Sequence, residues 1–334
     1  MGELVGVATD KVVGESEVIN DIPLPSAVSS ARKGVADVHV TGLRSFLRCR
    51  KQWHYRYERG LEPLGLGPKS WGTGSLFHAG MRAIYTVLKE SGAQPGDLDV
   101  DQAMDHALPA MMQEQVERGG DGDLAEKMVR YYWEHQGRKD TYDRIVQVEL
   151  PLRAKLDDET DLVGTMDLVL ERGGRIVIRD YKTVETLDTD ENYIRLDFQF
   201  QAYGWLANLH YGKPVELEIH QVRREVPREL TATGRPSKTI NNPPSKYIKC
   251  IPWFYSTEAL GRFGDRVLGV QQDIRAARLS GSWPRTDSHH GGLSCASCPY
   301  NLLCGDELLY GDRDDKDLEM FYRKVQHETN DTTA

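Results

Sequence analysis

Two runs of alternating apolar and polar residues lie on either side of a glycine pair near the middle of the chain. The first run, at 162–171, reads LVGTMDLVLE, and the second, at 175–184, reads RIVIRDYKTV. Alternation with a period of two predicts β-strands, and Gly173-Gly174 suits a two-residue hairpin loop because both glycines can adopt positive φ. The pattern therefore predicts a β-hairpin in which Arg172 pairs with Arg175.

This pairing predicts a register for the whole hairpin, in which 171 pairs with 176, 169 with 178, 167 with 180 and 165 with 182. Asp167 and Asp180 would then lie opposite each other, with Cβ atoms about 4.5 to 5.5 Å apart, and Lys182 would point to the same face. Two carboxylates this close repel each other unless a cation lies between them. Oxygen ligands favour Mg²⁺ or Mn²⁺. The hairpin thus predicts either such a metal site or a strand end with solvated charges.

The same two periodicities predict the elements around the hairpin. Further strands are expected at 145–156, 215–226 and 247–255, and helices at 41–60, 72–91, 100–117, 124–137, 196–211 and 257–279. Pro109 is expected to kink the third helix. Glu149, in the strand before the hairpin, is expected to be either a solvent-facing residue or a supporting acid. Residues 1–37 lack sustained periodicity and predict a loose arm.

Composition narrows the class of protein. A chain of 334 residues with 39% hydrophobic content can bury one large core, and no run is long enough to span a membrane. The N-terminus has no basic region followed by an apolar stretch, so we expect a soluble intracellular protein. The five cysteines are an odd number, which argues against a disulfide framework, and the net charge of −9 argues against a broadly basic coat.

Basic residues are nevertheless concentrated along the helix predicted at 41–60. They alternate there with aromatic residues, as in many surfaces that bind nucleic acids through phosphates and stacked bases. The other interpretation is an amphipathic helix with a solvated basic face. The basic residues are Arg44, Arg48, Arg50, Lys51, Arg56 and Arg59, and the aromatic ones are Trp53, Tyr55 and Tyr57.

Four short motifs, taken in order, resemble those of the PD-(D/E)XK nucleases in their RecB-like branch. This branch includes the CRISPR-associated single-strand exonucleases and the AddB nuclease domain. The segment GTGSLFH, ending at His78, is similar to motif I, Gly-x-x-x-His, and the segment GTMD, ending at Asp167, is similar to motif II. Asp180-Tyr181-Lys182 resembles motif III. Gln199 and Tyr203, one helical turn apart, resemble the Gln-x-x-x-Tyr motif that follows it.

The resemblance implies a role for each matching residue. His78, Asp167, Asp180 and the carbonyl of Tyr181 would hold one or two Mg²⁺ or Mn²⁺ ions. Without the resemblance, His78 would be explained as well by a structural role. Lys182 would position a water molecule and stabilise the transition state, and the Gln199 and Tyr203 side chains would line the substrate channel. The implied catalytic set is Asp167, Asp180, Lys182, Gln199 and Tyr203.

Three cysteines near the end of the chain, Cys295, Cys298 and Cys304, have the spacing of metal ligands. A tetrahedral site needs a fourth thiolate, and only Cys49 and Cys250 remain. We interpret Cys250 as a small buried hydrophobic residue within a strand. The segment around Cys49 resembles the first-cysteine signature of iron-sulfur members of the superfamily. That resemblance implies a 4Fe-4S cluster, with zinc, or three unconnected cysteines, as the alternatives.

Together these resemblances imply an α/β protein with a PD-(D/E)XK (restriction-endonuclease-like) core. A central mixed β-sheet would be flanked by helices, and an iron-sulfur cluster would join N- and C-terminal segments. The expected organisation is an arm at 1–37, a RecB-like nuclease domain at 38–305 and an acidic tail at 306–334 that is helical from about 318 to 327. Within the domain we expect a helical lobe at about 72–140, a catalytic sheet at about 143–255 and the cysteine cluster at 295–304.

The implied activity is metal-dependent DNA exonuclease action on DNA ends, in recombination, repair or phage DNA processing. The resemblance places it in the cytoplasm of a prokaryotic cell or a phage-infected host. The chain lacks the phosphate-binding motif of a helicase, so it would act alone or beside a separate recombinase or helicase. The alternatives are an inactive DNA-binding or scaffold protein with the same fold, and a zinc-stapled endonuclease.

Overall fold

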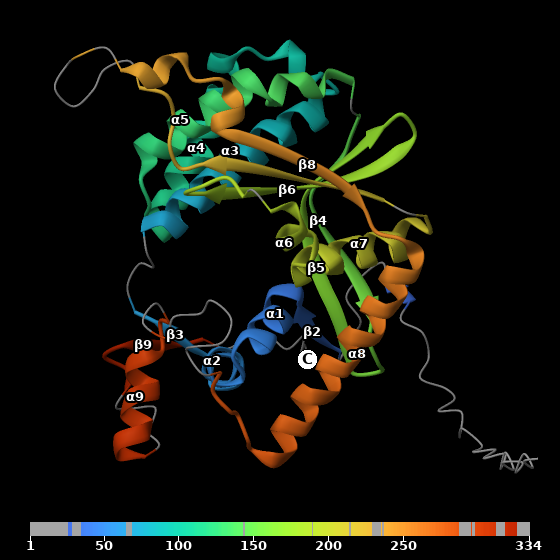
Figure 1. Cartoon of the computed structure of the whole chain (residues 1–334), viewed down its shortest axis with the longest axis vertical. Helices are drawn as coiled ribbons and strands as arrows, with labels where there is room; N and C mark the ends of the chain where they lie inside the picture. The colour runs from blue at the N-terminus through green and yellow to red at the C-terminus, as the bar shows by residue number, and fades with distance from the viewer. Residues whose placement is uncertain are drawn as a thin grey trace, which may run out of the picture.

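In the computed structural model a central β-sheet separates two groups of helices (Figure 1). None of the helices in the described part of the chain is long and apolar enough to cross a membrane. The described residues are 26–28, 35–64, 69–142, 144–188, 190–213, 215–228, 235, 237–286, 295, 298–311 and 318–325.

The central sheet is seven-stranded and mixed. The strand order is β1-β4-β5-β6-β7-β8, and β2 pairs with β5 beside this path. β2 runs parallel to β5 and β6 runs parallel to β7, whereas the other pairs are antiparallel. The mixed sheet flanked by helices that we predicted is therefore confirmed. The strands are β1 (Ser26–Val28), β2 (Ala36–His39), β4 (Arg144–Lys155), β5 (Thr160–Arg172), β6 (Arg175–Val184), β7 (Glu216–Arg223) and β8 (Ile248–Phe254).

The β5–β6 hairpin has the predicted register, but its ladder is shorter than predicted. Arg172 pairs with Arg175 across the glycine turn, and pairing continues to Leu168 with Arg179. The predicted pairs 167–180 and 165–182 are wrong, because the strands separate there. The Asp167 carboxylate accepts the Tyr181 N–H at 3.0 Å in place of a backbone partner. In addition, β2 pairs with the first residues of β5, 160–163.

Helices α3 (Lys69–Ser91), α4 (Val100–Arg118) and α5 (Gly122–His135) form the helical lobe on one face of the sheet (Figure 1). α4 runs through Pro109 as one helix. Buried side chains of the lobe pack against alternate residues of β5 and β6. The other residues of these strands pack against the second group: α1 (Val40–Arg48), α6 (Glu191–Arg195), α7 (Phe198–Tyr211) and α8 (Thr257–Ser280).

The helix predicted at 41–60 is interrupted at Cys49. Cys49 has an extended backbone, with φ −161° and ψ 111°, so it ends α1 and caps α2 (Arg50–Trp53). Its Sγ accepts the Gln52 N–H at 3.5 Å, and a π-helical turn, His54–Glu58, follows α2. The apolar spacing continues across this break, which explains why the pattern predicted a single helix. The break places the Cys49 thiol at a junction between two helices.

Both predicted terminal segments contain strands. β1 and the start of β2 lie within 1–37, so the described part of that arm belongs to the sheet; residues 1–25 and 29–34 lie outside the described residues. At the other end, the prediction of a helix to about residue 327 is wrong, because β9 (Tyr322–Lys324) pairs with β3 (Leu61–Pro63). Figure 1 shows this pair beside α9 (Asn301–Tyr310). Residues 312–317, four of which are acidic, and residues 326–334 lie outside the described residues.

Short helical turns complete the described structure. Of these, η3 bears on the site because it carries Asp140 against the sheet. The turns are η2 (Pro95–Asp97), η3 (Gly137–Tyr142), η4 (Lys238–Asn241) and η5 (Pro244–Lys246).

Candidate active site

The candidate site lies where β5 and β6 separate. The pairing of β2 with β5 ends at Val163, and the pairing of β6 with β5 begins at Leu168. Within the described part of the chain, residues 164–167 of β5 therefore have no strand partner on the edge that faces β2 and β6. Asp167 lies in this segment, and Asp180 lies on β6 beside Ile219 of β7. Besides burial, the charge of Asp167 raises the pKa of Asp180. The sheet thus holds the two acids at the point where the backbone pairing of β5 with β6 ends.

Asp167 is bound by two groups from different elements. Its Oδ2 lies 3.2 Å from His78 Nδ1 on α3 and accepts the Tyr181 N–H at 3.0 Å. Burial alone would raise the pKa of Asp167, but the charge and hydrogen bond of His78 outweigh it and hold the pKa below its usual value. Burial would lower the pKa of His78, and Asp167 in turn raises it above its usual value. The two groups therefore stabilise each other as an ion pair.

Asp180 is the more deeply buried of the two acids. Only 3% of the residue is exposed, and its Oδ2 lies 2.7 Å from Lys182 Nζ. Burial, together with the charge of the neighbouring Asp167, raises the pKa of Asp180 to about 6 against the opposing charge of Lys182. Burial would lower the pKa of Lys182, but Asp180 and Asp167 raise it, so the lysine stays charged. The site thus contains two acids whose pKa values are shifted in opposite directions.

The donor chemistry of this site suits a hard divalent cation. Two carboxylates, an imidazole and a backbone carbonyl are ligands for Mg²⁺ or Mn²⁺. The buried Asp180 Oδ2 makes an ion pair with Lys182 but no well-aligned hydrogen bond, so it retains an unused acceptor. However, no group of three or more His, Cys, Asp or Glu side chains within the described residues has metal-holding geometry. His78 and Lys182 neutralise the acids instead, and the predicted ligand set stays a prediction.

Gln199 and Tyr203 lie on one face of α7, at the spacing the sequence predicts. Gln199 Nε2 donates to Tyr203 Oη at 2.7 Å, and both residues are buried. Gly164 on β5 permits α7 to pack closely against this strand, because a Cβ at that position would lie 2.8 Å from Leu206 Cδ1 and 3.3 Å from the Tyr203 ring. Arg44 on α1 donates to Gln199 Oε1 at 3.3 Å. A chain of hydrogen bonds therefore runs from α1 along α7 to Tyr203.

Glu149 is a third acid of the site, whose role the sequence left open. The ladder pairs Val148 with Leu168 and Leu150 with Met166, so Glu149 lies across from Asp167. Its φ is +51°, a conformation that costs a non-glycine residue roughly 1–2 kcal/mol. Burial and the charge of Asp167 raise the pKa of Glu149, while Arg82, 3.8 Å away, opposes that rise. A strained acid beside Asp167 fits the supporting role better than a solvent-facing one.

A buried ionic network that the sequence analysis missed lies on the helical-lobe side of β6. Arg179 is fully buried and donates to Asp140 at 2.9 Å and to Glu218 at 2.8 Å. His220 lies beside Glu218 and shares a hydrogen bond with Tyr132 of α5. The signal was an arginine within the apolar run IVIR of β6. Because β6 also carries Asp180, this network joins the helical lobe to the strand that bears the site.

The four cysteines predicted to bind a cluster do not form a group with metal-holding geometry within the described residues, so the predicted cluster stays a prediction. Burial raises the pKa values of Cys298 and Cys304, and both also respond to the charge of Cys49. The Cys298 N–H donates to the Cys295 carbonyl at 3.1 Å. Cys250 lies within a strand, β8, as predicted, but it is half-buried, against the core of the helical lobe. All five thiols are free.

Charged contacts also join the N- and C-terminal segments near these cysteines. Glu307 on α9 accepts the Tyr55 hydroxyl at 2.6 Å and makes ion pairs with Lys51 at 2.6 Å and Arg59 at 3.2 Å. Thr286 donates to the Arg48 carbonyl at 2.9 Å, next to Cys49. These contacts therefore hold the segment around Cys49 against the C-terminal segment that carries Cys304.

Comparison with known proteins identifies the family. No curated protein matches the chain. Among solved structures, that of SSO0001 is 10% identical, with a TM-score of 0.35, over 82% of this chain and 89% of that one. A phage-related exonuclease from Haemophilus somnus 129PT is 18% identical, with a TM-score of 0.29, over 41% of this chain and 63% of its own. The family model of the PD-(D/E)XK nuclease superfamily matches residues 38–305, which is most of the sequence. The chain therefore belongs to the PD-(D/E)XK nuclease superfamily.

Proposed function

We propose that this protein is a divalent-metal-dependent DNA exonuclease of the RecB-like branch. Its superfamily makes DNA the expected substrate. The observation that carries the proposal is the arrangement of Asp167, Asp180 and Lys182. Two interacting acids, with one pKa lowered and the other raised to about 6, lie beside a charged lysine on a rigid sheet. Such opposed shifts are typical of acids at functional sites.

Asp167, Asp180, His78 and the Tyr181 carbonyl would hold the cation, which is Mg²⁺ or Mn²⁺ by its ligands. When bound, such an ion supplies Lewis-acid chemistry to a phosphate and its attacking water. Lys182 has three N–H donors, so it can keep its ion pair with Asp180 and still orient the water. Its positive charge offsets the negative charge that develops on the scissile phosphate.

Gln199 and Tyr203 would hold the substrate strand. The Tyr203 oxygen accepts a hydrogen bond from Gln199, which leaves the phenolic proton available to a phosphate oxygen. Burial raises the pKa of Tyr203 well above its usual value, so the hydroxyl remains a donor at neutral pH. Arg44 fixes the amide of Gln199 from the other side and so orients the pair.

Cys49, Cys295, Cys298 and Cys304 would hold a 4Fe-4S cluster with a structural role. Besides burial, the charge of Cys49 raises the pKa values of both Cys298 and Cys304, which supports this assignment. The position of Cys49 at the end of α1, where the helix is interrupted, supports it as well. Zinc would suit four thiolates equally by charge. Broad visible absorption of anaerobically purified protein is expected for iron-sulfur, whereas a colourless protein would indicate zinc.

By resemblance, the activity would serve recombination, repair or phage DNA processing in the cytoplasm, beside a recombinase or helicase. Degradation of end-labelled linear DNA, end-blocked DNA and circular DNA with Mn²⁺ tests the activity and its mode. An exonuclease degrades only the linear DNA with open ends. Cutting of the circle would instead indicate the endonuclease alternative.

The variant Lys182→Ala tests the site itself. It is expected to lower the rate of DNA hydrolysis by about 10²- to 10³-fold, because Lys182 supplies charge at the transition state. Lys155→Ala is a matched control, since that lysine is equally exposed (35% against 34%) and paired with Asp158 at 2.6 Å. Equal and negligible degradation by wild type and Lys182→Ala would favour the inactive DNA-binding protein.

A further inference from the structure

A groove lined by arginines opens directly beside Lys182 and His78. We call it the arginine groove; its volume is about 590 Å³. It lies between α3, the end of α4 and the strand ends of β6 and β7. Its basic residues besides Lys182 are Arg82, Arg118 and Arg224.

Small residues on one face of α3 form the floor of this groove. Gly74, Ser75 and Ala79 line it on α3 together with His78, and Arg82 is the long side chain that this helix contributes. A Cβ at Gly74 would lie 2.9 Å from Thr183 Oγ1, which shows how closely α3 approaches β6 there. The groove therefore offers space for a ligand next to His78 and Lys182 of the site.

The charge of the groove contrasts with that of the whole protein. Its lining residues include one carboxylate, Glu114, against the three arginines and Lys182, although the chain has a net charge of −9. Arg118 uses its Nε to bind Glu114 at 2.8 Å, and Arg82 lies 3.8 Å from Glu149. A guanidinium has five donors, so these pairs leave donors that can reach a phosphate. Side chains of Arg118 and Arg82 are 64% and 47% exposed.

Arg224 is held more rigidly than the other two. Its Nη1 donates to the Thr183 carbonyl at 3.1 Å, its Nη2 lies 3.1 Å from Glu185 Oε1, and its side chain is 20% exposed. Thr183 follows Lys182 on β6, so the position of this guanidinium is tied to the catalytic strand. Arg224 also lines a second cavity of about 890 Å³, beside α5, and so lies between the two spaces.

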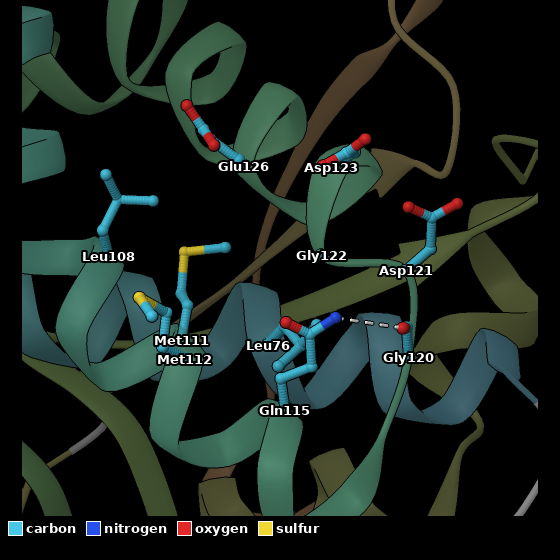
Figure 2. A pocket seen from close by; sticks show the side chains of 10 residues that line it. All are labelled: Leu76, Leu108, Met111, Met112, Gln115, Gly120, Asp121, Gly122, Asp123 and Glu126. Atoms are coloured by element: carbon cyan, nitrogen blue, oxygen red, sulfur yellow. Dashed lines mark hydrogen bonds between the residues drawn. The ribbon is translucent and has the colours of Figure 1, made fainter.

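The neighbouring pocket formed by α3, α4 and α5 is lined by carboxylates and apolar side chains and, among the described residues, has no basic residue in its lining. It is about 480 Å³ in volume, and Figure 2 shows Leu108, Met111 and Met112 on one side and the carboxylates of Asp121, Asp123 and Glu126 on the other. The Gln115 amide donates to the Gly120 carbonyl at 3.4 Å at its edge (Figure 2). These carboxylates repel phosphates, so a nucleic acid strand is favoured in the arginine groove and disfavoured here.

We propose that the arginine groove binds the phosphodiester backbone of the nucleotides next to the scissile bond, with Arg82 and Arg118 as phosphate ligands and Arg224 as a fixed anchor. This inference rests on the proposed function, because it assigns a path to the substrate of the same site. The groove begins at Lys182 and His78, so a strand bound in it continues from the reacting phosphate without leaving the protein surface.

Anisotropy of a fluorescein-labelled single-stranded oligonucleotide in EDTA measures binding without cleavage. Arg118→Ala and Arg82→Ala are each expected to weaken binding by about threefold to tenfold and to reduce the slope of log K against log salt by about 0.7. Arg262→Ala is the matched control. Arg262 is 67% exposed and ion-paired to Glu258 one turn earlier on α8, as Arg118 is to Glu114.

In steady-state hydrolysis the groove variants should raise KM and leave kcat nearly unchanged, since they remove ground-state binding. Arg118→Ala and Arg82→Ala variants that bind and cleave like Arg262→Ala, while the wild type cleaves, would overturn the groove assignment and leave the nuclease proposal intact. A wild type that neither binds nor cleaves DNA would overturn both proposals. Lost binding by Arg262→Ala as well would also overturn the assignment, because the effect would then be one of overall charge.

Discussion

Asp180 makes the stability of the folded protein depend on pH. Burial raises the pKa of Asp180 to about 6 from an ordinary value of 3.8, so the unfolded chain loses this proton first as pH rises. Its contribution to stability is fully present below about pH 4 and is lost as pH rises through about 6, with a total on the order of 3 kcal/mol. The acid thus destabilises the metal-free fold at neutral pH.

Replacement of this acid tests that account. In EDTA, wild type should lose up to about 3 kcal/mol of unfolding free energy as pH rises from about 4 to about 8, and Asp180→Asn should not lose it. The stability of the variant relative to wild type should therefore be higher at about pH 8 than at about pH 4 by up to that amount. Urea denaturation at both pH values measures the difference, and hydrolysis by the variant should be lost. A stability difference that is the same at both pH values would contradict the proposed ionisation of Asp180.

At the residue scale, the sequence predicted contacts that arise from local geometry. The Gly173-Gly174 turn sets the hairpin register as far as Leu168 with Arg179, and Asp167 and Asp180 follow directly beyond that last pair. The positive φ of Glu149 could not be predicted, because non-glycine residues rarely adopt it and the neighbouring residues carry no sign of it. Arg179 was missed because its partners, Asp140 and Glu218, lie 39 residues away on either side.

At the element scale, the Arg179 network joins η3 and the helical lobe to β6 and β7. Arg179→Met should lower the free energy of unfolding by about 3–5 kcal/mol, because it leaves Asp140 and Glu218 buried without their cation. Chemical denaturation measures this loss. Arg175→Met is the control, since Arg175 on the same strand is 60% exposed and lies 3.8 Å from Glu216. It should change stability by less than about 1 kcal/mol. Equal effects of the two substitutions would contradict the role of the network.

The sequence predicted the ends of an element where the apolar periodicity determines them. It did not predict the ends that depend on a side-chain hydrogen bond or on pairing with a distant segment. The strands β4, β7 and β8 lie where the alternation placed them, within a few residues. The β5–β6 ladder ends early because the Asp167 side chain takes a backbone N–H that the pattern assigned to the ladder. β9 has three residues, and its partner β3 lies at the other end of the domain, so no local signal marks it.

At the scale of the whole molecule, the proposed cluster would connect segments that are distant in sequence. Cys49→Ser should abolish the visible absorption of the purified protein and lower its melting temperature, because a ligand of the proposed cluster is lost. Cys250→Ser is the control, since Cys250 lies on β8 and packs against the helical lobe. Iron analysis and thermal unfolding measure both effects. Retention of iron by Cys49→Ser would exclude Cys49 as a ligand.

The alternation along β6 has a consequence for how the protein gains its activity. Arg179 and Tyr181 belong to the helical-lobe side, whereas Ile176 and Ile178 belong to the α7 side, with Lys182 over the Phe200 ring of α7. A slip of β6 by one residue would place the Arg179 guanidinium among the aliphatic side chains of the α7 side and the Asp180 carboxylate in the core of the helical lobe. Misaligned molecules would therefore be too unstable to persist. The proposed hydrolysis therefore requires the same strand register that builds the two cores.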